Sequence, residues 1–151
     1  MADACPWNWI AMPEDEDDRI TTLKMLNILG TAPEPEFDRI VEMGARAFNA
    51  PMCHVALVDE ARIWFKATTG LDAEGCGRDS SFCSLTVMPH GPTIFEVPDT
   101  LLDSRFSKSP LVTGPPHIRY YAGAPLLVKG HKLGTSTSRC AALSHAPKTS
   151  P

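Results

Sequence analysis

The stretch MCHVALVDEARIWFKATT, residues 52–69, decides the fold of this 151-residue chain. It begins with the compact apolar run Met52–Val58, which is rich in strand-forming residues. Residues 59–62 then reverse the chain, and residues 63–69 again favour a strand. The stretch therefore predicts a β-hairpin. The 14 prolines of the chain agree with this prediction, because so many turn formers argue against an all-helical bundle.

Two helices are predicted before the hairpin. The first covers residues 19–29 and has apolar side chains on more than one face, so it should pack on the domain and on a partner. The second follows Pro35 and has apolar residues at helical spacing as far as Phe48. Proline suits the first turn of a helix, where its missing N–H costs nothing.

Short elements are predicted after the hairpin. They are a helix over 79–88, strands over 93–97 and 118–128, a turn over 129–131 and a further strand from residue 132. The long stretch 98–117 is rich in turn formers, yet it contains apolar residues that a solvated linker does not need. Long structured loops in compact domains are usually lids or binding loops. This loop is therefore the first candidate for function.

Both ends of the chain differ from the middle. Six of the 18 acidic residues fall within the first 18 positions, which we expect to form an acidic disordered tail. Ser136 to Arg139 replace the apolar residues that would continue the last strand, and residues 144–151 are small and polar with two prolines. We therefore expect residues 136–151 to be disordered and the domain to span residues 19–135.

Charge and cysteine content exclude several classes of protein. A formal charge of −4 argues against a nucleic acid or membrane partner, because both need a concentrated basic face. The sequence has no membrane-spanning run and no secretory signal, so we expect a cytoplasmic protein. Five cysteines without a C-x-x-C pair and five scattered histidines fit neither a disulfide framework nor a metal site. We predict reduced thiols, no metal and no cofactor.

Six blocks stand in order between residues 20 and 135: ILGTAPEPEFDRI (28–40), VDEARIWF (58–65), GL (70–71), RDSSFC (78–83), VPDTLLDSRF (97–106) and PLVTGPPHIRYYAGAPL (110–126). Together they resemble a GAF sensor domain. They are similar to the subgroup found at the front of many two-component kinases and diguanylate cyclases. The resemblance implies an α+β fold with an antiparallel sheet of five or six strands flanked by helices. It also implies that the last strands and the final helix are incomplete here.

The resemblance further implies a non-catalytic regulatory domain in signal transduction. Such a domain binds a small molecule under its long loop, here residues 98–118, and relays the signal to an output protein such as a kinase or cyclase. Two alternatives stay open. One is a ligand-free interaction module that forms a homodimer through the helix over 19–29. The other is a cysteine-based redox sensor that uses Cys83.

One group of candidate ligand-binding residues lies at the start of the short helix. Asp79, Ser81 and Phe82 precede or begin this helix, where free N–H groups could hold an anionic ligand. Ordinary helix capping explains the polar residues equally well. Cys83 is the cysteine best placed for chemistry, because a thiol in the first turn of a helix can be activated. In an apolar helix face it would be inert.

A second group of candidates lies on or beside the long loop. It consists of Asp99, Arg105, Arg119 and Tyr121. An arginine here could bind a ligand carboxylate or phosphate through two parallel hydrogen bonds. Alternatively, Asp99 or Asp103 pairs with one of these arginines and holds the loop shut.

Overall fold

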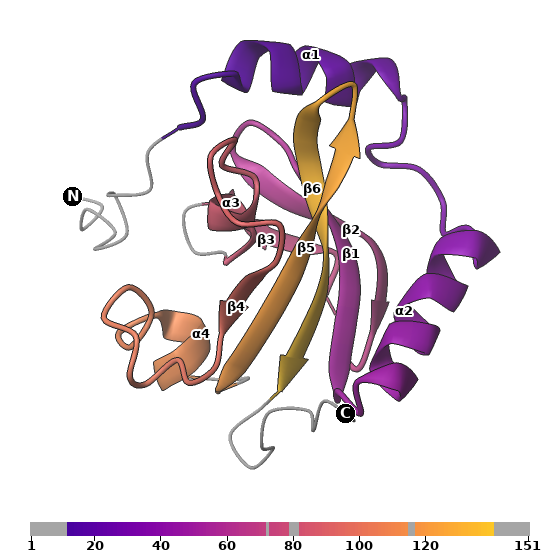
Figure 1. Ribbon diagram of the computed structural model, residues 1–151. Coiled ribbons are helices and arrows are strands. Elements are labelled where there is room, and N and C mark those ends of the chain that lie inside the picture. The colour runs from indigo at the N-terminus through magenta and orange to yellow at the C-terminus, as the bar shows by residue number, and fades with distance from the viewer. Residues whose placement is uncertain (1–11, 72, 79–81, 115–116, 141–151) are drawn as a thin grey trace.

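A computed structural model describes residues 12–71, 73–78, 82–114 and 117–140 (Figure 1). Its centre is a six-stranded antiparallel sheet with the strand order β3-β2-β1-β6-β5-β4. The elements are α1 (Glu16–Met25), α2 (Pro35–Ala47), β1 (Met52–Val58), β2 (Arg62–Thr69), β3 (Gly75–Gly77), α3 (Cys83–Thr86), β4 (Phe95–Val97), α4 (Pro110–Thr113), β5 (Tyr120–Val128) and β6 (His131–Cys140). The predicted α+β fold is confirmed.

The two faces of the sheet carry different helices. Every residue of β1 is buried, because both of its faces are covered. Cys53 and Val55 pack against α2 through Val41, while Ala56 and Val58 pack with Cys83 of α3. In Figure 1, α1 and α2 lie at the top and right of the sheet, and α3 and α4 lie to its left. None of the helices within the described ranges is both long and apolar enough to cross a membrane.

Strands β5 and β6 form a hairpin with a two-residue turn. Lys129 and Gly130 both have positive φ, 51° and 81°. Two consecutive residues of this kind form the turn that matches the twist of the adjoining strands, and glycine adopts it without steric cost. The turn expected over residues 129–131 is therefore present.

The expectation that the sheet ends at Thr135 is wrong. β6 continues to Cys140, and residues 136–139 pair with β1 on one side and β5 on the other. Thr135 and Thr137 are buried there, and each hydroxyl has a hydrogen-bond partner. A buried hydroxyl with a partner carries little penalty, and threonine favours strands, so no apolar run is needed. The other expected parts, a disordered tail over 141–151 and an incomplete final helix, lie outside the described residues.

The N-terminal boundary also differs from the prediction. α1 begins at Glu16 and ends at Met25, so residues 12–18 belong to the domain and not to a disordered tail. Its first turn consists of the acidic residues Glu16, Asp17 and Asp18. Negative charge at this end of a helix interacts favourably with the helix dipole, which explains why an acidic run starts a helix here. Residues 1–11 lie outside the described residues.

Candidate functional site

Six buried polar side chains gather between the centre of the sheet and α3. We call this group the polar cluster, and each member is at most 1% exposed. Its members are His54, Cys83, Thr86, Tyr121, Thr135 and Thr137. They come from β1, α3, β5 and β6, so the fold brings together residues that are far apart in the sequence.

The thiol of Cys83 lies at the centre of the polar cluster. Thr135 Oγ1 donates to its Sγ over 3.4 Å and Tyr121 Oη over 3.6 Å, while His54 Nε2 lies 3.8 Å from the same atom. The network extends on both sides. Thr137 Oγ1 lies 2.6 Å from His54 Nε2, and Thr86 Oγ1 lies 3.1 Å from Tyr121 Oη. The six side chains therefore form one connected network.

Strand register and one glycine place these side chains. His54 and Thr137 are direct cross-strand partners on β1 and β6, and Gly123 of β5 faces Thr137 from the other side. A Cβ atom on Gly123 would lie 2.6 Å from the Tyr121 hydroxyl oxygen, so only glycine leaves room for this tyrosine side chain. The His54 ring packs against Phe65 at a centroid distance of 4.7 Å.

An aromatic wall separates the polar cluster from the long loop. Phe82 stacks on Phe106 of the loop at 4.3 Å and on Tyr121 at 4.9 Å between ring centroids. Val112 and Ile118 of the same loop pack in one apolar cluster with Phe82, Phe106 and Tyr121. Phe82 and Tyr121 therefore connect the polar cluster to the apolar core beneath the loop.

The loop over 98–118 is held by its own side chains. Arg105 donates two hydrogen bonds to the carboxylate of Asp103, over 3.0 and 2.7 Å, and its guanidinium lies over the Phe95 and Phe106 rings. This hydrogen bond lowers the pKa of Asp103 below its usual value. Asp99 accepts from the Leu101 amide over 3.0 Å. The structure therefore favours the hypothesis that Asp103 pairs with Arg105 and holds the loop, over the hypothesis that Arg105 binds a ligand.

Arg119 holds the other end of the loop. Its Nη1 donates to the carbonyl oxygens of Val112, over 2.8 Å, and Ile118, over 3.2 Å. Its own carbonyl oxygen accepts from the Thr100 amide over 3.0 Å. Arg119 therefore links the start and the end of the loop to β5.

The structure divides the predicted site residues into two groups. Phe82, Cys83 and Tyr121 lie in the polar cluster or its aromatic wall. Asp99, Arg105 and Arg119 instead bind groups within or beside the loop. Asp79 and Ser81 lie outside the described residues. Full burial of Cys83 favours an inert thiol over a redox sensor, because reactive thiols are partly exposed.

Sequence reasoning missed four members of the polar cluster. They are His54, Thr86, Thr135 and Thr137. Only His54 could have been singled out in the sequence, because its imidazole stands inside the otherwise apolar run Met52–Val58. The part of the chain that the structure describes contains no group of three His, Cys, Asp or Glu residues placed to hold a metal ion.

A separate groove of about 300 Å³ lies on the opposite face of the sheet. Its lining includes Gly44 of α2, Phe48 directly after α2, and Ile94 directly before β4. Its floor consists of small residues of β5 and β6, among them Ala122 and Ser136. Most of the side chains that line this groove are apolar or small.

Comparison with known proteins identifies a family. The family model described as GAF domain matches residues 32–137. A cyclic di-GMP phosphodiesterase of Pseudomonas aeruginosa is 38% identical over 124 residues, which are 82% of this chain and 21% of that protein. The chain thus spans about a fifth of the length of this relative.

Solved structures agree with this match at the level of the fold. The GAF domain of an Acinetobacter phosphoenolpyruvate-protein phosphotransferase superposes with a TM-score of 0.57 at 16% identity, over 89% of this chain and 82% of that one. A type II free methionine-R-sulfoxide reductase from Thermoplasma acidophilum has a TM-score of 0.58 at 13% identity, over 76% of each chain. Likenesses at such low identity show the fold alone.

Proposed function

Because this chain belongs to the GAF domain family, whose members are regulatory sensor domains in signalling proteins, we propose that it is a non-catalytic sensor that binds a small molecule at the polar cluster. The proposal includes relay of the binding signal to an output protein such as a kinase or a cyclase, and a cytoplasmic location. The relative from Pseudomonas aeruginosa, a phosphodiesterase, adds a third class of output enzyme.

The polar cluster is the observation that carries this proposal. Filling the space between the sheet and α3 with apolar side chains would avoid the cost of burying polar groups. The chain instead places three hydroxyls of threonine, a phenol, an imidazole and a thiol there. Such groups recognise a ligand by hydrogen bonds. Because none of them is a carboxylate, an ammonium or a guanidinium, they favour a small polar molecule that carries little charge.

Two consecutive tyrosines of β5 provide a matched test. Tyr121 points into the polar cluster, while Tyr120 points to the other face and donates to Glu96 over 3.1 Å. In a thermal-shift screen of small polar molecules, an authentic ligand should raise the melting temperature of the wild type and of Tyr120→Phe. It should raise that of Tyr121→Phe much less. Equal shifts in both variants would place the ligand elsewhere.

The open groove favours a second candidate function, dimerisation with another copy of this chain. α1 directs Ile20 and Leu23 to the core, so the surface predicted for dimerisation offers only Met25 and Leu26 as exposed large apolar residues. On α2, Met43 is 69% exposed and directly precedes Gly44, which lines the groove. The exposed charges of α2 alternate in sign along the helix, in the order Glu36, Arg39, Glu42 and Arg46.

This order of charges suits an antiparallel pair of identical helices. In such a pair Glu36 of one copy faces Arg46 of the other, and Arg39 faces Glu42, while the exposed Ile40 and Met43 side chains lie between the helices. Light scattering tests this candidate. A dimer that Met43→Glu converts to a monomer would support it, and a monomeric wild type at high concentration would exclude it.

A further inference from the structure

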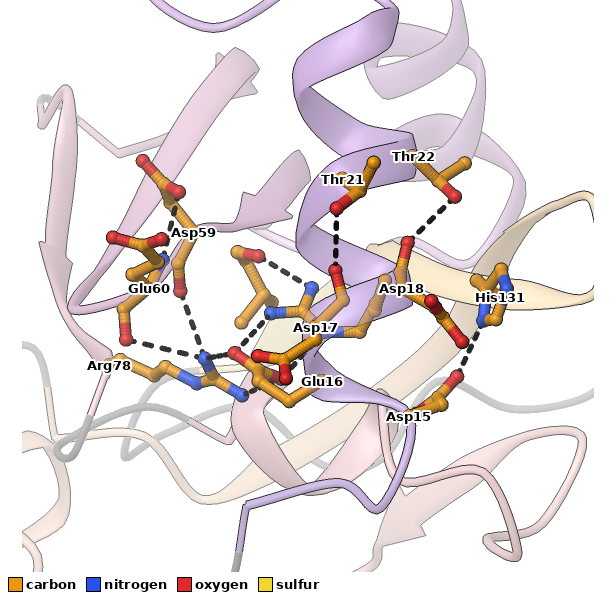
Figure 2. A network of polar contacts seen from close by, with 12 residues as sticks. Asp15, Glu16, Asp17, Asp18, Thr21, Thr22, Asp59, Glu60, Arg78 and His131 are labelled. Atoms are coloured by element: carbon orange, nitrogen blue, oxygen red, sulfur yellow. Dashed lines mark hydrogen bonds and ion pairs between the residues drawn. The ribbon is translucent and has the colours of Figure 1, made fainter.

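A network of charged side chains connects α1 to the segment that leads into α3 (Figure 2). The carboxylate of Glu16 receives two hydrogen bonds from Arg78, one between Nη2 and Oε2 at 3.1 Å and a shorter one between Nη1 and Oε1. Arg78 directly follows β3 and is buried. The two residues are 62 positions apart, so this ion pair is a tertiary contact.

Arg78 also binds two other parts of the domain. Its Nη1 donates to the carbonyl oxygens of Asp59, over 3.1 Å, and Glu60, over 3.3 Å, in the turn between β1 and β2. Its own carbonyl oxygen accepts a short hydrogen bond from the hydroxyl of Ser84 in α3. One residue therefore joins α1, the turn between β1 and β2, and α3.

Glu16 is the anion for a second buried guanidinium. Arg19 is fully buried, and its Nε and Nη2 donate to the Glu16 carboxylate over 2.9 and 3.1 Å. Its Nη1 donates to the Val58 carbonyl oxygen over 2.6 Å. Removal of the Glu16 charge would leave two buried cations without their counter-ion, a change that is much costlier than the loss of a surface pair.

We infer that Glu16 is the positioning residue through which α1 controls the polar cluster. The path is short, because Ser84 is bonded to Arg78 and directly follows Cys83, the centre of the cluster. A displacement of α1 that keeps the pair between Glu16 and Arg78 acts on Arg78 and, through its hydrogen bond with Ser84, on α3. By reciprocity, a change in α3 must act on α1 with the same free energy. The inference rests on the proposed function only where it treats the polar cluster as a ligand-binding site. The chain of contacts from Glu16 through Arg78 to Ser84 exists without a ligand.

The chain offers a matched control for this link. α1 also contacts the turn between β1 and β2 through an exposed pair between Lys24 Nζ and Glu60 Oε1, at 3.1 Å. Glu60→Gln removes that pair and keeps the backbone carbonyl that Arg78 uses. It therefore weakens the attachment of α1 without acting on the path to α3.

Two buried cysteines on opposite faces of the sheet serve as reporters. Cys83 lies in the polar cluster at 0% exposure, and Cys53 packs under α2 at 2%. The experiment measures labelling of each thiol by a maleimide under native conditions, with peptide mass spectrometry, in the whole chain. For Glu16→Gln, labelling of Cys83 should accelerate about tenfold more than labelling of Cys53, because local opening at α3 adds to any loss of global stability. Glu60→Gln should leave both rates unchanged.

Two results would overturn the inference. Equal acceleration of both cysteines would mean that Glu16 only supports global stability, and an unchanged Cys83 rate would mean that α1 is not coupled to α3. If Glu16→Gln does not fold, Ser84→Ala tests the same link from the side of α3, because it removes the hydrogen bond to Arg78. It should then accelerate amide hydrogen exchange in α1, and unchanged exchange there would refute the link. Ligand binding is not measured, so a failure here is distinct from failure of the Tyr121→Phe screen.

Discussion

Thr137 Oγ1 of β6 lies 2.6 Å from Nε2 of His54, its cross-strand partner on β1. Both side chains are buried at the centre of the sheet, and the same imidazole nitrogen lies 3.8 Å from Cys83 Sγ. The contact therefore ties the last strand to the polar cluster. It also explains how a strand with serines and threonines can occupy a central position.

Thr137→Val tests the energetic contribution of this contact. The substitution keeps the shape of the side chain and removes the hydroxyl, so His54 loses a buried hydrogen-bond partner. We expect the free energy of unfolding to fall by about 1–3 kcal/mol, measured by urea denaturation. The neighbouring Ser136→Ala is the control, because Ser136 lines the groove on the other face. Equal losses in the two variants would contradict a special role for the His54 contact.

The ionisation of Glu16 predicts how stability depends on pH. Burial alone would raise the pKa of Glu16, but hydrogen bonds from Arg78 and Arg19 outweigh it and lower the pKa from 4.5 to about 2. A lowered pKa in the folded state stabilises the fold above pH 4.5, and this contribution is lost as the pH falls toward 2.

The corresponding experiment compares wild type and Glu16→Gln across this range of pH. Wild type should be the more stable at pH 7, and the difference should shrink progressively as the pH falls from 4.5 toward 2. Denaturant titrations at several pH values measure it. A difference that stays constant down to pH 2 would show that the carboxylate charge is not the cause.

The two loop arginines should differ in their effect on proteolysis. Arg119 donates hydrogen bonds to the carbonyl oxygens of two buried residues, Val112 and Ile118. Arg105 instead forms an exposed pair with Asp103. Exposed pairs contribute little to stability, so Arg119→Ala should raise the cleavage rate between residues 98 and 114 several-fold, and Arg105→Ala only slightly. Limited proteolysis with mass spectrometry measures both. A larger effect from Arg105→Ala would reverse this assignment.

Much of the fold follows from local sequence patterns. The apolar run Met52–Val58 and the spacing of apolar residues after Pro35 predicted β1 and α2, because each pattern reports burial on a regular element. β3 escaped prediction, since the residues Gly75–Gly77 form a strand only by pairing with β2. The strand from 136 to 140 could not be predicted from composition, because polar residues normally indicate exposure, whereas Thr137 is buried with a partner.

The candidate site is only partly visible in the sequence. Phe82, Cys83 and Tyr121 were predicted from their place at a helix start or beside the long loop, and they lie in or beside the polar cluster. The contact between Glu16 and Arg78 could not be predicted, because nothing local to either residue indicates the other. Their proximity depends on how α1 crosses the sheet, which is a tertiary property.

Native mass spectrometry tests the central claim most directly. Wild-type protein purified without denaturation should carry a non-covalent adduct of fixed mass that is released on unfolding. Tyr120→Phe should retain this adduct and Tyr121→Phe should lose most of it, because only Tyr121 donates into the polar cluster. A wild type without any adduct, even after incubation with compounds from the thermal-shift screen, would contradict the account, and so would an adduct that persists equally in both variants.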